Sequence, residues 1–187
     1  HVTFRAHPRY LCHTKQFANM NRNVLVALGL LSGVGLAVLA VRCAVVGRPS
    51  FLFLAWNLLL AWMPVLFAHI ALRNAPAGGW LRPISQGGVV AIGALGLWLL
   101  FFPNAPYLFT DFAHLPKANL LAPAWLNVLL FGVFALTGVL LGMVSLLGVH
   151  GLLARKWGQR WAWGAVGAVC YLAGYGVYLG RIERWNS

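Results

Sequence analysis

The stretch VLVALGLLSGVGLAVLAVRCAVV, from Val24 to Val46, decides the fold of this chain. Its only charged residue is Arg42, close to its end. A helix needs about 20 consecutive apolar residues to cross roughly 30 Å of hydrocarbon, and this stretch is long enough. It therefore predicts a transmembrane helix.

The composition of the whole chain agrees with this prediction. Hydrophobic residues make up 61% of the sequence and charged residues only 9%, whereas about a quarter of an ordinary soluble domain is charged. Inside lipid every backbone N–H and C=O needs a partner within the protein, which only helices and closed barrels provide, and the sequence lacks the period-two alternation of a barrel. We therefore expect an all-α fold, a polytopic transmembrane helical bundle of about five spans. The expected spans are Val24 to Val46, Phe51 to Leu72, Ile84 to Phe102, Ala124 to His150 and Trp161 to Gly180.

The basic residues predict the orientation in the membrane. The net charge of +12 does not indicate a nucleic-acid partner, because Arg and Lys are scattered at the ends of spans and form no single patch. We interpret them as topology signals and contacts to lipid headgroups. Assigning loops to alternate sides places nine of the 14 basic residues with the amino terminus and five opposite, which favours an amino terminus in the cytoplasm. The five are Arg42, Arg48, Lys117, Arg181 and Arg184.

The ends of the chain carry two further expectations. Residues 1–19 contain no apolar region of the kind that a signal peptide needs, and MNRNVLVALGLL from Met20 resembles an ordinary start of a membrane protein. We expect residues 1–19 to be a non-native or mis-called segment, and residues 20–187 to form a single transmembrane domain. Without the first segment the charge count is six against five, so the orientation then depends mainly on Arg155, Lys156 and Arg160.

Neither a metal site nor a cofactor is predicted. Cys12, Cys43 and Cys170 are far apart in the sequence. None of them has a second cysteine or a histidine at the spacing of a metal site, and no disulfide framework is indicated.

Three glycine pairs have the spacing that lets membrane helices approach closely. They are Gly29 with Gly33, Gly138 with Gly142, and Gly176 with Gly180. We expect them to serve packing within one bundle rather than homodimerisation.

The stretch FFPNAPYLFTDFAHLP, from Phe101 to Pro116, is the strongest indication of function. Its first two prolines, Pro103 and Pro106, lack an N–H, so the third span cannot continue through them unbroken. We expect Asn104 to cap a second, short helix that ends at His114, ahead of the last proline. Such a helix would be interfacial or re-entrant.

Four polar residues share one face of this short helix, because their spacings are three, four and three. They are Asn104, Tyr107, Asp111 and His114. Asp111 is one of only two acidic residues in the chain, so a carboxylate and a histidine on this face indicate a functional polar cluster. Arg181, expected on the same side of the membrane, would pair with Asp111.

The chemistry of this cluster stays open. Asp111 and His114 would serve as a proton relay, as an oriented base, or as two metal ligands, which are too few to predict a metal. The alternative is architectural: Thr110 and Asp111 cap a helix that starts later, and His114 is an interfacial side chain. For each residue alone the two interpretations are about equal, and the conjunction of acid, histidine, phenol and carboxamide favours function.

Other polar residues within the spans have plainer interpretations. We expect interhelical hydrogen bonds from Asn57, His69, Thr137 and Ser145, a solvated His150, and a stacking face from Tyr171, Tyr175 and Tyr178. Asn57, His69, Thr137 and Ser145 are also candidates for further members of the polar cluster, because they lie inside the spans.

Several stretches resemble one family of small bacterial integral membrane proteins. They are LWLLFFPNAPYLFTDFAHL, LTGVLLG followed by SLLGVH, LAWNLLLAWMP, and the closing YLGRIERWNS. The resemblance covers most of Phe51 to Ser187, and the family is catalogued as domain of unknown function thirteen sixty-one. It implies a multi-pass protein of the bacterial plasma (inner) membrane, but no activity and no site residues. Members continue past the RWNS position into a further hydrophobic span, which implies that this chain is truncated at its carboxyl end.

Three classes of function remain open. A binding or transport protein would line a site for a small ligand with the Asn104 to His114 segment, as broken helices do in transporters. A membrane-embedded enzyme would act on a lipid-linked substrate, with Asp111 and His114 in acid–base roles and Arg181 holding a phosphate. A structural or assembly subunit would dock another membrane protein. We favour the first class, with the lipid bilayer and a small ligand as partners.

Overall fold

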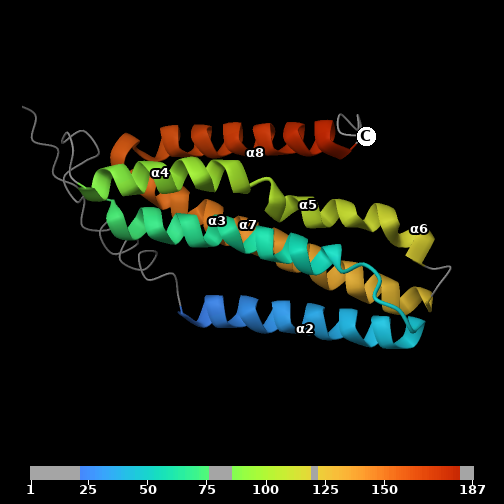
Figure 1. Ribbon diagram of the computed structural model, residues 1–187. Helices are drawn as coiled ribbons and strands as arrows, with labels where there is room; N and C mark the ends of the chain where they lie inside the picture. The colour runs from blue at the N-terminus through green and yellow to red at the C-terminus, as the bar shows by residue number, and fades with distance from the viewer. Residues whose placement is uncertain (1–21, 76–85, 119–121, 182–187) are drawn as a thin grey trace, which may run out of the picture.

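The structure, a computed structural model, describes residues 22–75, 86–118 and 122–181. The expected non-native segment, residues 1–19, lies outside these ranges. The described residues form helices and no strand: α2 (Arg22–Val46), α3 (Phe53–Asn74), α4 (Gln86–Phe101), α5 (Asn104–Thr110), the 3-10 helix η1 (Asp111–His114), α6 (Leu115–Ala118), α7 (Ala124–Trp157) and α8 (Gln159–Arg181). The long helices run side by side, with α2 and α8 along two outer edges and α3, α4 and α7 between them (Figure 1).

Five helical segments of the described chain are long and apolar enough to cross a membrane. They are Arg22–Val46, Phe53–Asn74, Gly87–His114, Ala124–Trp157 and Gln159–Leu179. The prediction of an all-α, multi-pass bundle with five spans is therefore confirmed. The largest differences from the predicted bounds are in two spans: the fourth continues to Trp157, and the third includes the short motif helix.

Helix α7 is the centre of the bundle, because it contacts α2, α3, α5 and α8. Its buried residues recur along its length from Leu126 to Leu152. Phe131 and Phe134 form the main core together with Leu54 of α3 and neighbouring apolar residues. In lipid, such packing contributes through close contact and hydrogen bonds more than through exclusion of water.

The third span needs the motif segment to reach across the membrane. Helix α4 has 16 residues, which at 1.5 Å per residue gives about 24 Å, short of the roughly 30 Å of hydrocarbon. The segment from Asn104 to His114 completes the crossing. Of the two placements expected for this helix, the structure has the one inside the bundle, where α5 packs on α7 and α3.

The helix break lies where the prolines predict it. Helix α4 ends at Phe101, and α5 begins after Pro103, which occupies its N-cap position. The predicted capping role of Asn104 is wrong, because its Nδ2 donates to the carbonyl oxygen of Phe101 at 3.0 Å. The side chain of Asn104 therefore satisfies the end of the preceding helix instead of the start of the new one.

The motif segment ends at His114, ahead of Pro116, as predicted, but it consists of two helices, α5 and η1. After η1 the chain continues into α6, which contains Pro116 at its second position and runs to Ala118. A proline is tolerated in the first turn of a helix, where its missing N–H has no partner to lose. The tighter 3-10 turn of η1 separates the two α-helical pieces, so Pro116 begins a new turn rather than interrupting one.

Glycines on α7 allow α5 to pack closely. A Cβ atom at Gly138 would lie 2.5 Å from the carbonyl oxygen of Ala105, and one at Gly142 would lie 3.3 Å from the Cβ atom of Ala105. Packing within one bundle is thus confirmed for this pair. It does not account for Gly29 and Gly33, since a Cβ atom at either would meet nothing within 4 Å.

Candidate functional site

Polar residues from four parts of the chain gather at one end of the bundle. At this end α2 finishes, α3 begins, and the α5–η1–α6 segment lies beside the start of α7 (right-hand side of Figure 1). The described chain has a single acidic residue, Asp111, and it lies here.

Asp111 is buried inside the bundle, at 1% exposure. It begins η1, one residue after the end of α5. Nδ2 of Asn57, from α3, donates a hydrogen bond to its Oδ2 at 3.1 Å. The predicted interhelical hydrogen bond of Asn57 is thus confirmed, and its acceptor is the residue at the centre of the predicted polar cluster.

The orientation of Asp111 follows from the helical spacing of its neighbours. Leu108, three residues earlier, is 0% exposed and packs in the core, and residues three apart share a face in a 3-10 or α-helix. Phe109 points the other way and is 62% exposed. Asp111 and Leu108 therefore face the protein together, and Phe109 lies on the outer surface of the bundle.

His114 lies at the other end of η1 between aromatic rings. Its ring centre is 5.2 Å from that of Phe53 and 6.4 Å from that of Phe51. The imidazole is half-buried, so part of its surface is accessible from outside the bundle. Asp111 and His114 share one face of the 3-10 helix because they are three residues apart.

Thr110 does not have the capping role that the architectural interpretation gives it. Thr110 is the N-cap residue of η1, yet it makes no side-chain capping hydrogen bond there. Its hydroxyl instead donates to the carbonyl oxygen of Tyr107 at 2.7 Å. Thr110 therefore does not cap the following helix.

The other members of the predicted cluster are placed differently. Asn104 donates a hydrogen bond to the carbonyl oxygen of Phe101 at the end of α4, and so stabilises the helix break. Tyr107 is half-buried on α5. The side chain of Arg181 lies outside what the structure describes, so its pairing with Asp111 stays a prediction.

The burial of Arg42 is not predicted from the sequence, in which this residue looks like a topology signal at the end of a span. Arg42 is 0% exposed. Its Nε donates to Oδ1 of Asn127 at 2.7 Å, its Nη1 donates to the hydroxyl of Ser50, and its Cζ lies 4.4 Å from the ring centre of Phe51. A signal existed in the sequence: Arg42 stands within the apolar run, whereas Arg48 alone already marks its end.

Phe51 connects Arg42 to the surroundings of His114. Its ring faces the guanidinium of Arg42 and also lies near the rings of His114 and Phe131. Its backbone has φ +62°, a left-handed conformation that non-glycine residues rarely adopt. Such strained residues cluster at functional sites, where the surrounding structure enforces them.

Three other polar predictions are wrong. The hydroxyls of Thr137 and Ser145 donate to carbonyls of their own helix, Val133 and Gly142, and so make no interhelical bond there. His150 is buried rather than solvated, with its ring centre 4.3 Å from that of Trp163. Because α7 continues to Trp157, His150 lies within the helix and inside the bundle.

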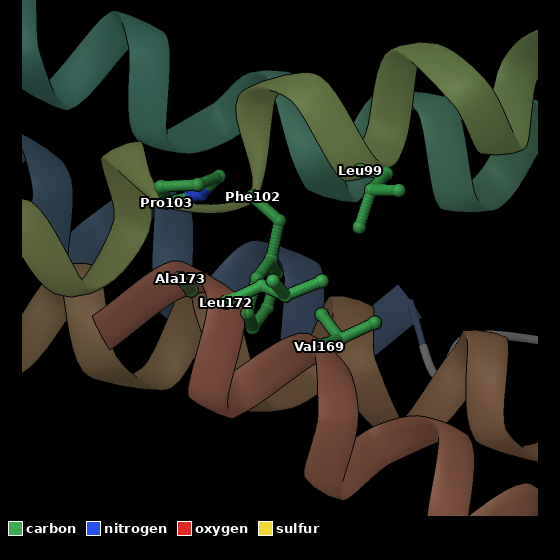
Figure 2. A pocket seen from close by; sticks show the side chains of 6 residues that line it. All are labelled: Leu99, Phe102, Pro103, Val169, Leu172 and Ala173. Carbon is green, nitrogen blue, oxygen red and sulfur yellow. The ribbon is translucent and has the colours of Figure 1, made fainter. Parts of the chain in front are cut away.

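An apolar pocket lies beside the helix break, away from the polar end. Figure 2 shows Phe102 pointing from the break toward α8. The lining is Leu99, Phe102, Pro103, Val169, Leu172 and Ala173. All six residues have apolar side chains, so this pocket suits hydrocarbon and its lining offers no polar side chain for catalysis or recognition. Among the described residues, no group of three or more His, Cys, Asp or Glu could hold a metal ion.

Comparison with known proteins identifies the family. Residues 56–187 match the family described as "Protein of unknown function (DUF1361)". The chain belongs to this family. No curated protein and no solved structure matches the chain. The DUF1361 match contains Asn57, Asp111 and His114, and it begins after Arg42 and Phe51.

Proposed function

We propose that this DUF1361 protein resides in the bacterial plasma membrane and binds or transports a small ligand at the Asp111 site, defined here as Asn57, Asp111, His114, Phe51 and Phe53. The observation that supports the proposal is the burial of Asp111 at 1% exposure in a membrane span. A carboxylate inside a membrane protein is costly and marks a functional site by default.

The broken third span supports the same function. Transporters place their substrate sites where a membrane helix is interrupted, because the interruption exposes polar backbone and side chains inside the bundle. Here α4 stops at Phe101 and the next helical pieces carry Asp111 and His114. Asn57 supplies a donor from α3, so two spans contribute polar groups to one location.

The aromatic residues beside His114 favour a ligand with an organic part. Phe51 and Phe53 flank the imidazole, and Phe53 is partly exposed at 38%. Aromatic walls with a few convergent polar groups are typical of small-molecule sites. A cationic or hydrogen-bond-donating group of the ligand would then face the Asp111 carboxylate.

A membrane-embedded enzyme is the second candidate, because an acid and a histidine share a face of η1. With that arrangement Asp111 would orient His114, and His114 would act as a general base or acid toward a lipid-linked substrate. The two candidates differ in outcome: an enzyme releases a changed molecule, whereas a binding or transport protein releases the same molecule.

Native mass spectrometry of the purified chain tests the proposal. We expect a small molecule to remain bound to the wild-type protein after removal of detergent, and its occupancy to fall about tenfold or more in Asp111→Asn, since hydrogen bonds to a charged group are the strong ones. Thr137→Val is the matched control, because Thr137 is also buried at 1% exposure but bonds only the carbonyl of Val133. Equal occupancy in both variants would contradict the proposal.

Cysteine labelling tests the proposed orientation. Ala118 and Gln159 lie near opposite ends of α7, which at 34 residues spans about 50 Å. Since the charge distribution favours an outer position for the motif end, we expect cysteine at Ala118 to react with an impermeant maleimide in intact cells and cysteine at Gln159 to react only after lysis. Native cysteines are replaced first, and the reverse pattern would overturn the orientation.

A further inference from the structure

The charge of Arg42 is not balanced by its partners. A guanidinium stays protonated in proteins, and burying a charge is costly unless opposite charge or a full set of hydrogen bonds compensates. Asn127, Ser50 and Phe51, which hold Arg42, are all neutral. Nη2 of Arg42 is buried and has no hydrogen-bond partner among the described residues.

The position of this nitrogen is fixed rather than adventitious. Asn127 is 0% exposed, and its Nδ2 donates to the carbonyl oxygen of Ala122 at 3.2 Å, which orients Oδ1 toward Arg42. Ser50 and Phe51 come from the loop between α2 and α3. The guanidinium is therefore held in place by two segments, α7 and the α2–α3 loop, and one of its nitrogens, Nη2, remains without a partner among the described residues.

We propose that Arg42 anchors a phosphate-binding site at this end of the bundle. Arginine is well suited to phosphate, because its guanidinium stays charged and its N–H groups make charge-assisted hydrogen bonds to phosphate oxygens. The anion would accept a hydrogen bond from Nη2 and supply the missing negative charge. The inference goes beyond the proposed function: the two sites share Phe51, but Asp111 and Asn57 are not among the groups that hold Arg42.

The depth of Arg42 favours phosphate over other anions. Arg42 lies four residues before Val46, the last residue of α2, which corresponds to about 6 Å along a helix axis. That depth is next to the polar interface of the bilayer, where lipid phosphates are found. The phosphate belongs either to an anionic phospholipid or to a soluble phosphate ester.

The α2–α3 loop lies against the guanidinium of Arg42 through Ser50 and Phe51. It contains Gly47 at φ +73° and Phe51 at φ +62°, both left-handed. Arg48 and Pro49 of the same loop are exposed. A phosphate reaches Nη2 when this loop moves aside, and the strained backbone of Phe51 makes the closed loop easier to open.

Thermal unfolding of the full chain in maltoside micelles tests the proposal. The probes are phosphatidylglycerol, diacylglycerol as the matched lipid without phosphate, and glycerol 3-phosphate as the soluble ester. We expect a saturable rise in Tm with phosphatidylglycerol or glycerol 3-phosphate but none with diacylglycerol. A response to the lipid alone assigns a phospholipid, and a response to the soluble ester assigns a soluble ligand.

Matched variants decide whether Arg42 is responsible. In Arg42→Gln the apparent affinity for the responding probe should fall about tenfold or more, because a charge-assisted hydrogen bond is lost. Arg48→Gln removes the same charge six residues later at an exposed position, and it should keep the response. Asp111→Asn should also keep it, which separates this proposal from the proposed function.

Asn127→Asp keeps the test decisive even if Arg42→Gln does not fold. The new carboxylate would pair with Arg42 from within the protein, so we expect this variant to fold without added phosphate and to lose the phosphate response. The proposal is overturned if the wild type responds to no phosphate probe, if diacylglycerol gives the same rise, if Arg48→Gln loses the response, or if Asn127→Asp keeps it in full.

Discussion

Leucine in place of Gly138 is expected to prevent the motif segment from packing on α7 and to unfold this end of the bundle. Already a Cβ atom at Gly138 would lie 2.5 Å from the carbonyl oxygen of Ala105 and 3.0 Å from Cβ of Leu108. A backbone oxygen cannot rotate away as a side chain can, so the whole of α5 would have to shift. Overpacking typically costs about 1–3 kcal/mol and occasionally more, and we expect leucine to reach the upper end of that range.

Fluorescence-detected gel filtration and thermal unfolding in detergent measure this effect, with two glycines of the same helix as controls. A Cβ atom at Gly132 meets nothing within 4 Å, so Gly132→Leu should leave the stability unchanged or raise it, because glycine disfavours helix by about 1 kcal/mol. Gly142→Ala should fall between them, since its Cβ atom would lie 3.3 Å from that of Ala105. If Gly138→Leu is as stable as Gly132→Leu, the close packing of α5 on α7 is refuted.

The five spans could be predicted from sequence because hydrophobic length is a local property. A run such as Val24 to Val46 has to cross the membrane whatever it packs against, and a pair of prolines breaks a helix at the same place in any context. The end of α4 at Phe101 and the start of α5 after Pro103 can therefore be predicted from the sequence alone. The extension of α7 to Trp157 was not, because a basic helix end at Arg155 and Lys156 resembles a loop in composition.

The partners of the polar residues could not be predicted, because they depend on which helix faces which. Asp111 was recognised from its rarity, but its hydrogen bond to Asn57 joins residues that are 54 apart in the sequence. Arg42 resembles every other basic residue at a span end until α7 places Asn127 against it, 85 residues later. Asn104 was misassigned for a related reason: a side-chain amide accepts or donates, and only the local geometry decides which.

Asp111→Asn is expected to abolish the function of the protein while leaving it folded in the membrane. The replacement keeps the shape of the side chain and an oxygen that accepts from Nδ2 of Asn57, so the packing of η1 should survive. It removes the only acidic side chain among the described residues. A site that recognises a cationic or donor group, or orients His114, requires that charge, whereas an architectural role requires only the acceptor.

Complementation of a deletion strain measures the loss, and immunoblotted membrane levels control for folding. His114→Gln should give the same phenotype, and the double variant should be no worse than either single one, because residues that act as a unit are not additive. Thr137→Val should complement fully, since it removes a buried hydroxyl that bonds only its own helix. Full complementation by Asp111→Asn and by His114→Gln at normal levels would mean that the segment from Asn104 to His114 has only a structural role. Asn57 and the other neighbours of Asp111 would then offset the free energy of burying it, and the interaction would contribute only to the stability of the bundle.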